Sequence, residues 1–197
     1  MAVGPRILIC AFGPFPGVPA NPSERLARAL ARMRRPALAD CELALEILPT
    51  RWEALGLLQR HLHRHAPDAV LLMGVAPRRR VLCVETRAVN AAADRPDAAR
   101  RHPPTRLIEA AAPPVLRATA RVPALIAAAR ETGVPVRLSR DAGRYLCNAS
   151  YLTALTQAQG RPVVFVHVPG RMPARRAALP RALGALLVAL AAQARQR

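Results

Sequence analysis

The chain has 197 residues, of which 52% are hydrophobic, so it can bury one sizeable core and is not expected to be disordered. Its formal net charge is +18, and because the sequence contains no lysine, all 30 basic side chains are arginines. The four cysteines form no C-x-x-C pair and lack zinc-ligand spacing, so we expect no metal site.

The first half of the chain alternates between strand-like and helix-like segments. Residues 6–12 form a short apolar run typical of a buried strand, and a loop dense in Gly and Pro follows. Asn21 has the pattern of a helix N-cap, because Pro22 stands at the first helical position, where proline is tolerated. The expected elements are then a helix through 24–33, a strand at 41–49, a helix at 51–66, and strands at 68–76 and 80–90.

The second half continues this alternation. Residues 91–123 are rich in Pro, Ala and Arg and are expected to be mostly irregular. They are followed by an expected helix at 124–133, a strand at 135–139, a helix at 145–158, a strand at 162–169 and a terminal helix at 175–196, disturbed at Pro180. Strands that alternate with helices predict a single α/β domain over residues 1–197, with a mostly parallel twisted sheet covered on both faces.

The two ends of the chain predict neither secretion nor membrane insertion. Residues 1–10 lead straight into an apolar run, without the charged start and cleavage site of a signal peptide. The apolar stretch at 182–192 is too short to span a bilayer. We therefore expect a cytoplasmic protein with reduced thiols and no membrane partner.

The high positive charge has two interpretations. Nucleic acid or an acidic surface is a natural partner for a protein with a pI near 11.8. The arginines are scattered, however, and no aromatic side chains interleave with them to stack on bases. An arginine-rich solvated surface is therefore favoured over nucleic-acid binding, which stays as an alternative function.

Three positions qualify as parts of a functional site, because sites in open sheets of this kind form beyond the carboxyl ends of strands. They are the loop after Phe12, the strand end near His167 and the turn before Cys147. Cys147 stands at the start of a predicted helix, where unpaired N–H groups and the helix dipole favour a thiolate and can hold an oxyanion. A cysteine in an apolar stretch is also a common core residue, so its position leaves both interpretations open.

A cysteine nucleophile needs a histidine base and an acceptor that orients the histidine. His167 lies at the end of an apolar strand, and Glu85 lies near the end of another, where a polar side chain must be paired or used. Spacing alone leaves open whether they act with Cys147 or form a buried pair that satisfies itself. The remaining histidines, which are expected on the surface, are His61, His63, His65 and His102.

Several segments resemble the motifs of one known family. "AFGPFPGVPANPS" is similar to the N-terminal signature of pyroglutamyl peptidase I, also called pyrrolidone-carboxylate peptidase. "GVAPRRRVLCVETRAVN" and "ADRPD" resemble the family's glutamate and arginine segments, while "SRDAGRYLCN" and "FVHVP" resemble its cysteine and histidine motifs. The motifs occur in the family's order and cover most of the chain, so the resemblance favours a catalytic Cys147.

The resemblance implies a three-layer α/β/α fold and a cytoplasmic cysteine peptidase that needs no metal or cofactor. Such an enzyme removes N-terminal pyroglutamyl residues from peptides and is a homo-oligomer, a tetramer or a dimer. By motif position, Cys147 is the nucleophile, His167 the base and Glu85 the orienting acid of a triad that forms a thioester, and Arg95 falls near the reacting centre. The residues expected to bind the substrate, around its flat neutral lactam ring, are Phe12, Phe15, Asn21, Tyr145 and Leu146.

Some positions depart from the family's pattern. Val75 stands where the family often has glutamine, so one hydrogen bond to the lactam is expected to be missing. Pro77 and Arg78 replace small residues, and Thr86 stands where an arginine often follows the glutamate. A divergent member with altered or weak substrate specificity is therefore the second interpretation.

Overall fold

A six-stranded sheet lies at the centre of the structure, a computed structural model that describes residues 4–170 and 177–196. Its strand order is β2-β1-β3-β8-β4-β7, and a separate two-stranded sheet pairs β5 with β6. The strands are β1 (Arg6–Phe12), β2 (Glu42–Leu48), β3 (Ala69–Ala76), β4 (Leu82–Glu85), β5 (Arg87–Val89), β6 (Val115–Arg117), β7 (Val136–Ser139) and β8 (Val163–Pro169). The helices are α1 (Pro22–Ala31), the short 3₁₀ helix η1 (Pro36–Leu38), α2 (Ala54–His65), α3 (Val122–Arg130), α4 (Leu146–Thr156) and α5 (Leu179–Ala194).

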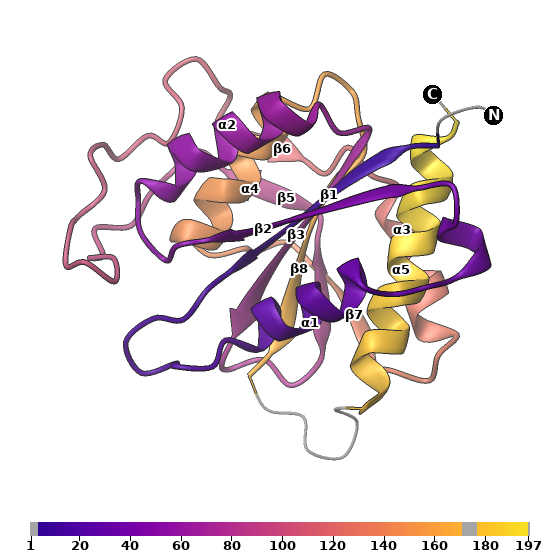
Figure 1. Cartoon of the computed structure of the whole chain (residues 1–197). Helices are drawn as coiled ribbons and strands as arrows, with labels where there is room; N and C mark the ends of the chain where they lie inside the picture. Colours follow the sequence, from indigo (N-terminus) through magenta and orange to yellow (C-terminus); the bar gives the residue numbers. More distant parts are fainter. Residues whose placement is uncertain (1–3, 171–176, 197) are drawn as a thin grey trace.

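Helices cover both faces of this sheet (Figure 1). Successive side chains of a strand point to opposite faces, so a continuous apolar run such as β1 supplies two separate cores. Ile7 and Ile9 pack into the core under α1, α3 and α5, whereas Leu8 and Cys10 pack into the core under α2 and α4. The predicted three-layer α/β/α fold is confirmed.

The strand directions are mostly, but not entirely, parallel. β2, β1, β3 and β8 run parallel to one another, as predicted. β4 runs antiparallel to β8, and β7 runs parallel to β4. This reversal decides which side chains of β4 and β8 become neighbours.

The strand expected at 80–90 is wrong as a single element. It ends at Glu85, and Thr86 is where the chain changes partner. The backbone N–H and the hydroxyl of Thr86 still donate to the carbonyl of Ser139, at 2.8 and 2.9 Å, but its carbonyl accepts from the Ala118 N–H, next to β6, at 2.9 Å. The chain then leaves the central sheet, and Arg87–Val89 pairs instead with Val115–Arg117. The segment 91–123, expected to be mostly irregular, contains this β6 and the first residues of α3.

Pro180 does not disturb α5, contrary to the prediction. The helix begins at Leu179, so Pro180 lies in its first turn, where the missing N–H has no intrahelical partner to lose. The predicted start at residues 175–176 lies outside the described residues. Within the ranges that the structure describes, no helix is both long and apolar enough to cross a membrane.

Candidate active site

Glu85 and His167 lie on the same face of the central sheet. In the antiparallel register of β4 and β8, Cys83 is opposite His167 and Glu85 is opposite Phe165, so Glu85 and His167 are diagonal neighbours. His167 Nδ1 lies 2.8 Å from Glu85 Oε1. Because an ionised carboxylate only accepts hydrogen bonds, Nδ1 is the donor and Nε2 is free to face another group.

Cys147 reaches this pair from the helix above. It is the second residue of α4, and the first helical hydrogen bond is donated by the Ala149 N–H to the carbonyl of Tyr145. The N–H groups before Ala149 therefore have no partner within the helix and can stabilise negative charge at the thiol or the substrate. The interaction of the Cys147 side chain with His167 is one of the influences that raise the pKa of that histidine.

Gly74 makes the space for the thiol. Its place on β3 is directly beside His167 in the sheet. A Cβ at this position would lie 2.8 Å from Cys147 Sγ and 2.9 Å from Phe165 Cζ, which is closer than real contacts of this kind. The absence of a side chain at Gly74 therefore lets α4 bring Cys147 down onto the sheet.

The charged groups in this cluster stabilise one another. Burial alone would lower the pKa of His167, but its interactions with Cys147 and Glu85 outweigh burial and raise that pKa to about 9. Burial would raise the pKa of Glu85, whose side chain is fully buried, but the hydrogen bond from His167 and the nearby charges hold it below its usual value. Arg79 supplies one of these charges, since its Nη1 donates to Glu85 Oε1 at 2.5 Å.

A cavity of about 480 Å³ opens above Cys147, within the size range of small-molecule sites. All the residues predicted to bind the substrate line it, together with Cys147 and Arg95, while His167 and Glu85 form the buried pair beneath. The predicted lining residues are Phe12, Phe15, Asn21, Tyr145 and Leu146. Its walls therefore combine aromatic and aliphatic surface with a few polar groups.

Asn21 places the loop that carries the two phenylalanines. Its Oδ1 accepts a hydrogen bond from the Ser23 N–H at 3.0 Å, which confirms the predicted N-cap of α1. Its Nδ2 donates to the carbonyl of Gly13 at 2.9 Å. One side chain thus starts the helix and holds the loop between Phe12 and Phe15 against it.

Arg95 lies at the exposed rim of the cavity. Its guanidinium carbon is 4.8 Å from the centre of the Tyr145 ring, a cation–π contact. The Tyr145 hydroxyl donates to the carbonyl of Pro96 at 3.1 Å, and Trp52 packs edge-on against the same ring. Arg95 therefore contacts the cavity wall through the ring of Tyr145.

Three residues of this site had been assigned no role from the sequence. Arg79 and Gly74 have the roles described above. Asn148 fastens α4 to β5, since its Nδ2 donates to the carbonyl of Val89 at 2.7 Å and its Oδ1 accepts from the Val89 N–H at 2.8 Å. Arg79 stands in a run of three arginines, and the fold brings it into contact with Glu85.

The four histidines expected on the surface lie away from this cluster. His63 and His102 are exposed, as predicted, and His65 is half-buried. The prediction is wrong for His61, which is only 9% exposed. The helix periodicity turns His61 towards the sheet, beside the buried Leu58 and Leu62.

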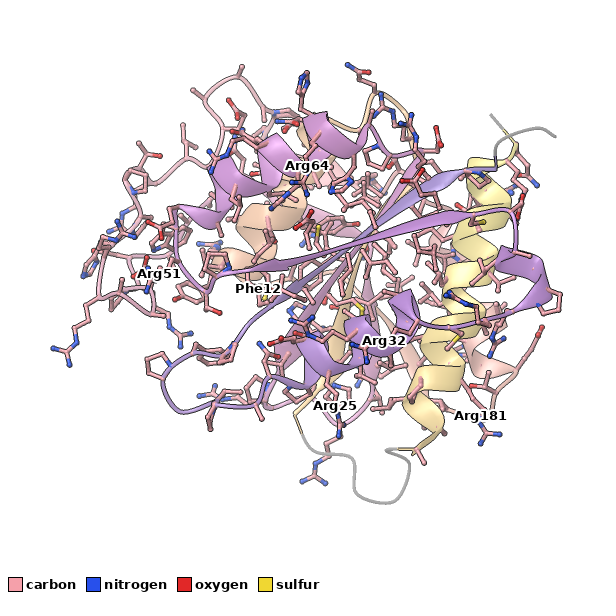
Figure 2. The ribbon with its side chains drawn as sticks, in the orientation of Figure 1. Phe12, Arg25, Arg32, Arg51, Arg64 and Arg181 are labelled. Atoms are coloured by element: carbon pink, nitrogen blue, oxygen red, sulfur yellow. The ribbon has the colours of Figure 1, made fainter. Side chains whose placement is uncertain are left out.

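Exposed arginines lie on more than one side of the part of the molecule that the structure describes. Figure 2 labels five exposed examples, which lie on or beside α1, α2 and α5, and these helices cover opposite faces of the sheet. They are Arg25, Arg32, Arg51, Arg64 and Arg181. This spread favours a solvated surface over a dedicated nucleic-acid site, and nucleic-acid binding stays a hypothesis that a mobility-shift assay at low and high salt would test.

Comparison with known proteins adds an independent finding. The model of the pyroglutamyl peptidase family matches residues 5–182. A pyrrolidone-carboxylate peptidase of Gloeobacter violaceus is 35% identical over 169 residues, covering 83% of this chain and 81% of the relative. One of Pyrococcus furiosus is 32% identical over 170 residues, covering 83% and 80%. The solved pyrrolidone carboxyl peptidase of Thermococcus litoralis is 28% identical with a TM-score of 0.86, over 98% of this chain and 96% of that one. The chain therefore belongs to the pyroglutamyl peptidase family.

Proposed function

We propose that this protein is a cysteine peptidase that removes N-terminal pyroglutamyl residues from peptides. The observation that carries the proposal is the position of His167, which bonds to Glu85 on one side and interacts with Cys147, on the cavity wall, on the other. In space, the nucleophile lies next to the base and the base lies next to the orienting acid, as acyl transfer by a thiol requires.

In the first half of the proposed reaction, the Cys147 thiolate attacks the carbonyl carbon that joins the pyroglutamyl residue to the peptide. The oxyanion of the tetrahedral intermediate lies at the start of α4, where free N–H groups stabilise it. His167 holds the thiol proton and gives it to the departing peptide amine. The C–N bond breaks, the shortened peptide leaves, and a thioester joins the pyroglutamyl group to Cys147.

In the second half, His167 takes a proton from a water molecule, and the resulting hydroxide attacks the thioester. The bond between sulfur and the acyl carbon breaks, which releases free pyroglutamate and restores the Cys147–His167 pair. Glu85 does not exchange protons in this scheme. It holds Nδ1 of His167 so that Nε2 faces the thiol, and it stabilises the imidazolium.

The cavity explains the proposed selectivity. The pyroglutamyl ring is small, flat and neutral, and an apolar wall that includes Phe12, Phe15 and Leu146 suits such a ring better than a charged N-terminal residue. Arg78 and Arg95 line the same cavity and disfavour a free cationic amine there. Peptides with a blocked, uncharged N-terminal pyroglutamate are therefore the proposed partners.

Release of a fluorophore from a pyroglutamyl amide tests the proposal. Wild-type protein should release it, and Cys147→Ala should not, while Cys41→Ala, a change at a half-buried cysteine outside the cavity, should leave the rate unchanged. An alanyl amide with the same leaving group checks selectivity and should be cleaved far more slowly. Absence of release by folded wild-type protein would contradict the proposal.

Altered specificity within the same fold is the second candidate. Val75 lines the cavity and presents no hydrogen-bonding group to the lactam. A substrate with a more apolar five-membered acyl group would lose no hydrogen bond at this wall. Comparing pyroglutamyl with cyclopentanecarbonyl amides separates the two candidates, because only the first requires a polar group that recognises the ring amide.

A further inference from the structure

Three potential metal ligands converge on the outer part of the sheet, between β2 and α2. Glu46 belongs to the edge strand β2, and His61 and His65 are four residues apart on α2, on one side of the helix. His61 Nδ1 lies 3.2 Å from Glu46 Oε1, and His65 Nε2 lies 2.7 Å from the same oxygen. None of the three lines the cavity of Cys147.

These separations suit a small divalent cation. Zn²⁺ binds nitrogen and oxygen at about 2.0–2.2 Å, so two ligands of a tetrahedral site lie roughly 3.3 Å apart. The three atoms in this cluster all lie within 4.8 Å of one another. The centres of the two imidazole rings are 6.2 Å apart, and the angle between the ring planes is 28°. Small side-chain rotations would bring three ligands around one ion and leave a fourth position for water.

A positive group already occupies this position. Nη2 of Arg64 contacts Glu46 Oε1 and lies 3.0 Å from His65 Nε2, so it touches two of the three ligands. Arg64 projects from the exposed side of α2 (Figure 2), and its side chain is 63% exposed. It can therefore swing into solvent. The side chains of the three ligands are more enclosed, being 11% exposed for His61, 17% for Glu46 and 22% for His65.

Both histidines can bind through the ring nitrogen that faces Glu46, which is Nδ1 of His61 and Nε2 of His65. A neutral imidazole has the free electron pair that a metal needs. Cys10 lies beside Glu46 in the sheet but is buried in the core under α2 and α4, so it is not counted among the ligands.

We propose that Glu46, His61 and His65 form a binding site for a first-row divalent cation, with Zn²⁺ as the best match to two imidazoles and one carboxylate. The site is separate from the catalytic centre, and its bound ion replaces the guanidinium of Arg64. A metal held there joins the edge strand β2 to α2 and stabilises the folded state, because the ligands come together only in that state.

Titration with Zn²⁺ against a chromophoric chelator tests this site, in a Cys147→Ala background so that the active-site thiol does not bind the metal. We expect one equivalent to bind and to raise the thermal midpoint. His65→Gln, which removes a half-buried ligand, should weaken binding at least about tenfold. His61→Gln should do the same, and His63→Gln, on the same helix but exposed, is the matched control and should bind like the parent.

Arg64 supplies a test in the opposite direction. Arg64→Ala removes the competing cation and should strengthen Zn²⁺ binding severalfold, whereas Arg60→Ala should have a smaller effect. Co²⁺ in place of Zn²⁺ should give the intense visible bands of a tetrahedral site, and these should disappear in His65→Gln. The proposal is overturned if folded protein shows no saturable binding up to about 1 mM Zn²⁺, a free energy of roughly 4 kcal/mol. Binding that is equal in His65→Gln and the parent would overturn it as well.

Discussion

His167 and Glu85 are separated by 82 positions in the sequence, yet their side chains meet at 2.8 Å inside the protein. The same oxygen of Glu85 also accepts a hydrogen bond from Arg79. Glu85 is fully buried, so its negative charge depends on these two positive partners. The proposed catalytic base is therefore oriented by a carboxylate that is itself held by an arginine.

Removing that arginine should impair catalysis without removing a triad residue. Arg79→Met leaves Glu85 with one charged partner, and a hydrogen bond to a charged group contributes about 1.5–3 kcal/mol, so kcat/KM should fall about 10- to 100-fold. Arg80→Met, at the exposed neighbour, is the control and should keep wild-type kinetics. Equal kinetics for Arg79→Met and wild type would show that Glu85 stays charged without Arg79.

The stability of the protein should depend on pH through His167. The pKa of a free histidine side chain is 6.5, and the folded protein raises that of His167 to about 9. Between pH 6.5 and about pH 9, the folded state therefore holds a proton that the unfolded state has released. The contribution of His167 is complete below pH 6.5 and is lost as the pH rises towards about 9. Urea unfolding at several pH values should therefore show a steeper decline for wild type than for His167→Gln.

A second variant separates the causes of that decline. The interaction with Cys147 is the largest influence that raises the pKa of His167, ahead of Glu85. Cys147→Ala should therefore reduce the slope of stability against pH, but should keep part of it. Identical slopes in wild type, His167→Gln and Cys147→Ala would show that His167 does not titrate in this range.

The four cysteines should differ in reactivity. A limiting amount of iodoacetamide at neutral pH should label Cys147 first, since it lies at a helix N-terminus on the cavity wall, and activity should fall in step with the label. Cys10 and Cys83 are buried, and burial raises the pKa of Cys10 and of the half-buried Cys41. Mass spectrometry of the peptides decides the order, and earlier labelling of any other cysteine would contradict an activated thiol at Cys147.

Gly74 should be intolerant of a side chain. Gly74→Ala places a methyl group 2.8 Å from Cys147 Sγ, so the thiol must move, and activity should fall more than tenfold for a destabilisation of about 1–3 kcal/mol. Gly56→Ala on α2 is the matched control, because its new methyl would meet only the flexible end of Arg60 at 3.8 Å. That variant should remain active and gain up to about 1 kcal/mol from helix propensity.

Val75 offers a gain-of-function test of substrate recognition. Val75→Gln supplies a hydrogen-bonding side chain on the cavity wall, and kcat/KM for pyroglutamyl amides should rise about 10- to 100-fold if the amide group reaches the ring. The cyclopentanecarbonyl analogue lacks the ring amide and should not gain. An unchanged constant for the pyroglutamyl substrate would show that another group recognises the lactam.

The sequence by itself determined most of the helices and strands and the residues of the candidate site. Apolar runs such as 6–12, the N-cap at Asn21 and the alternation of strands with helices depend on neighbouring residues, so local patterns were sufficient to predict them. The family motifs assigned Cys147, His167 and Glu85 to one site, and the fold places these residues close together. Their catalytic roles stay predictions. Whether residues 1–197 form a single domain, and whether copies assemble into a tetramer or dimer in the cytoplasm, stay predictions.

Only the tertiary structure decided how these parts meet. The end of β4 at Glu85 and the reversed direction of β4 come from pairing with β7 and β8, which are distant in sequence and leave no local signal. That pairing makes Glu85 a diagonal neighbour of His167, within reach of Arg79. The pairing of β3 with β8 sets Gly74 beside His167 and next to the thiol. The burial of His61 beside Glu46 arises in the same way, because the face that α2 turns to the sheet depends on packing as well as on helical spacing.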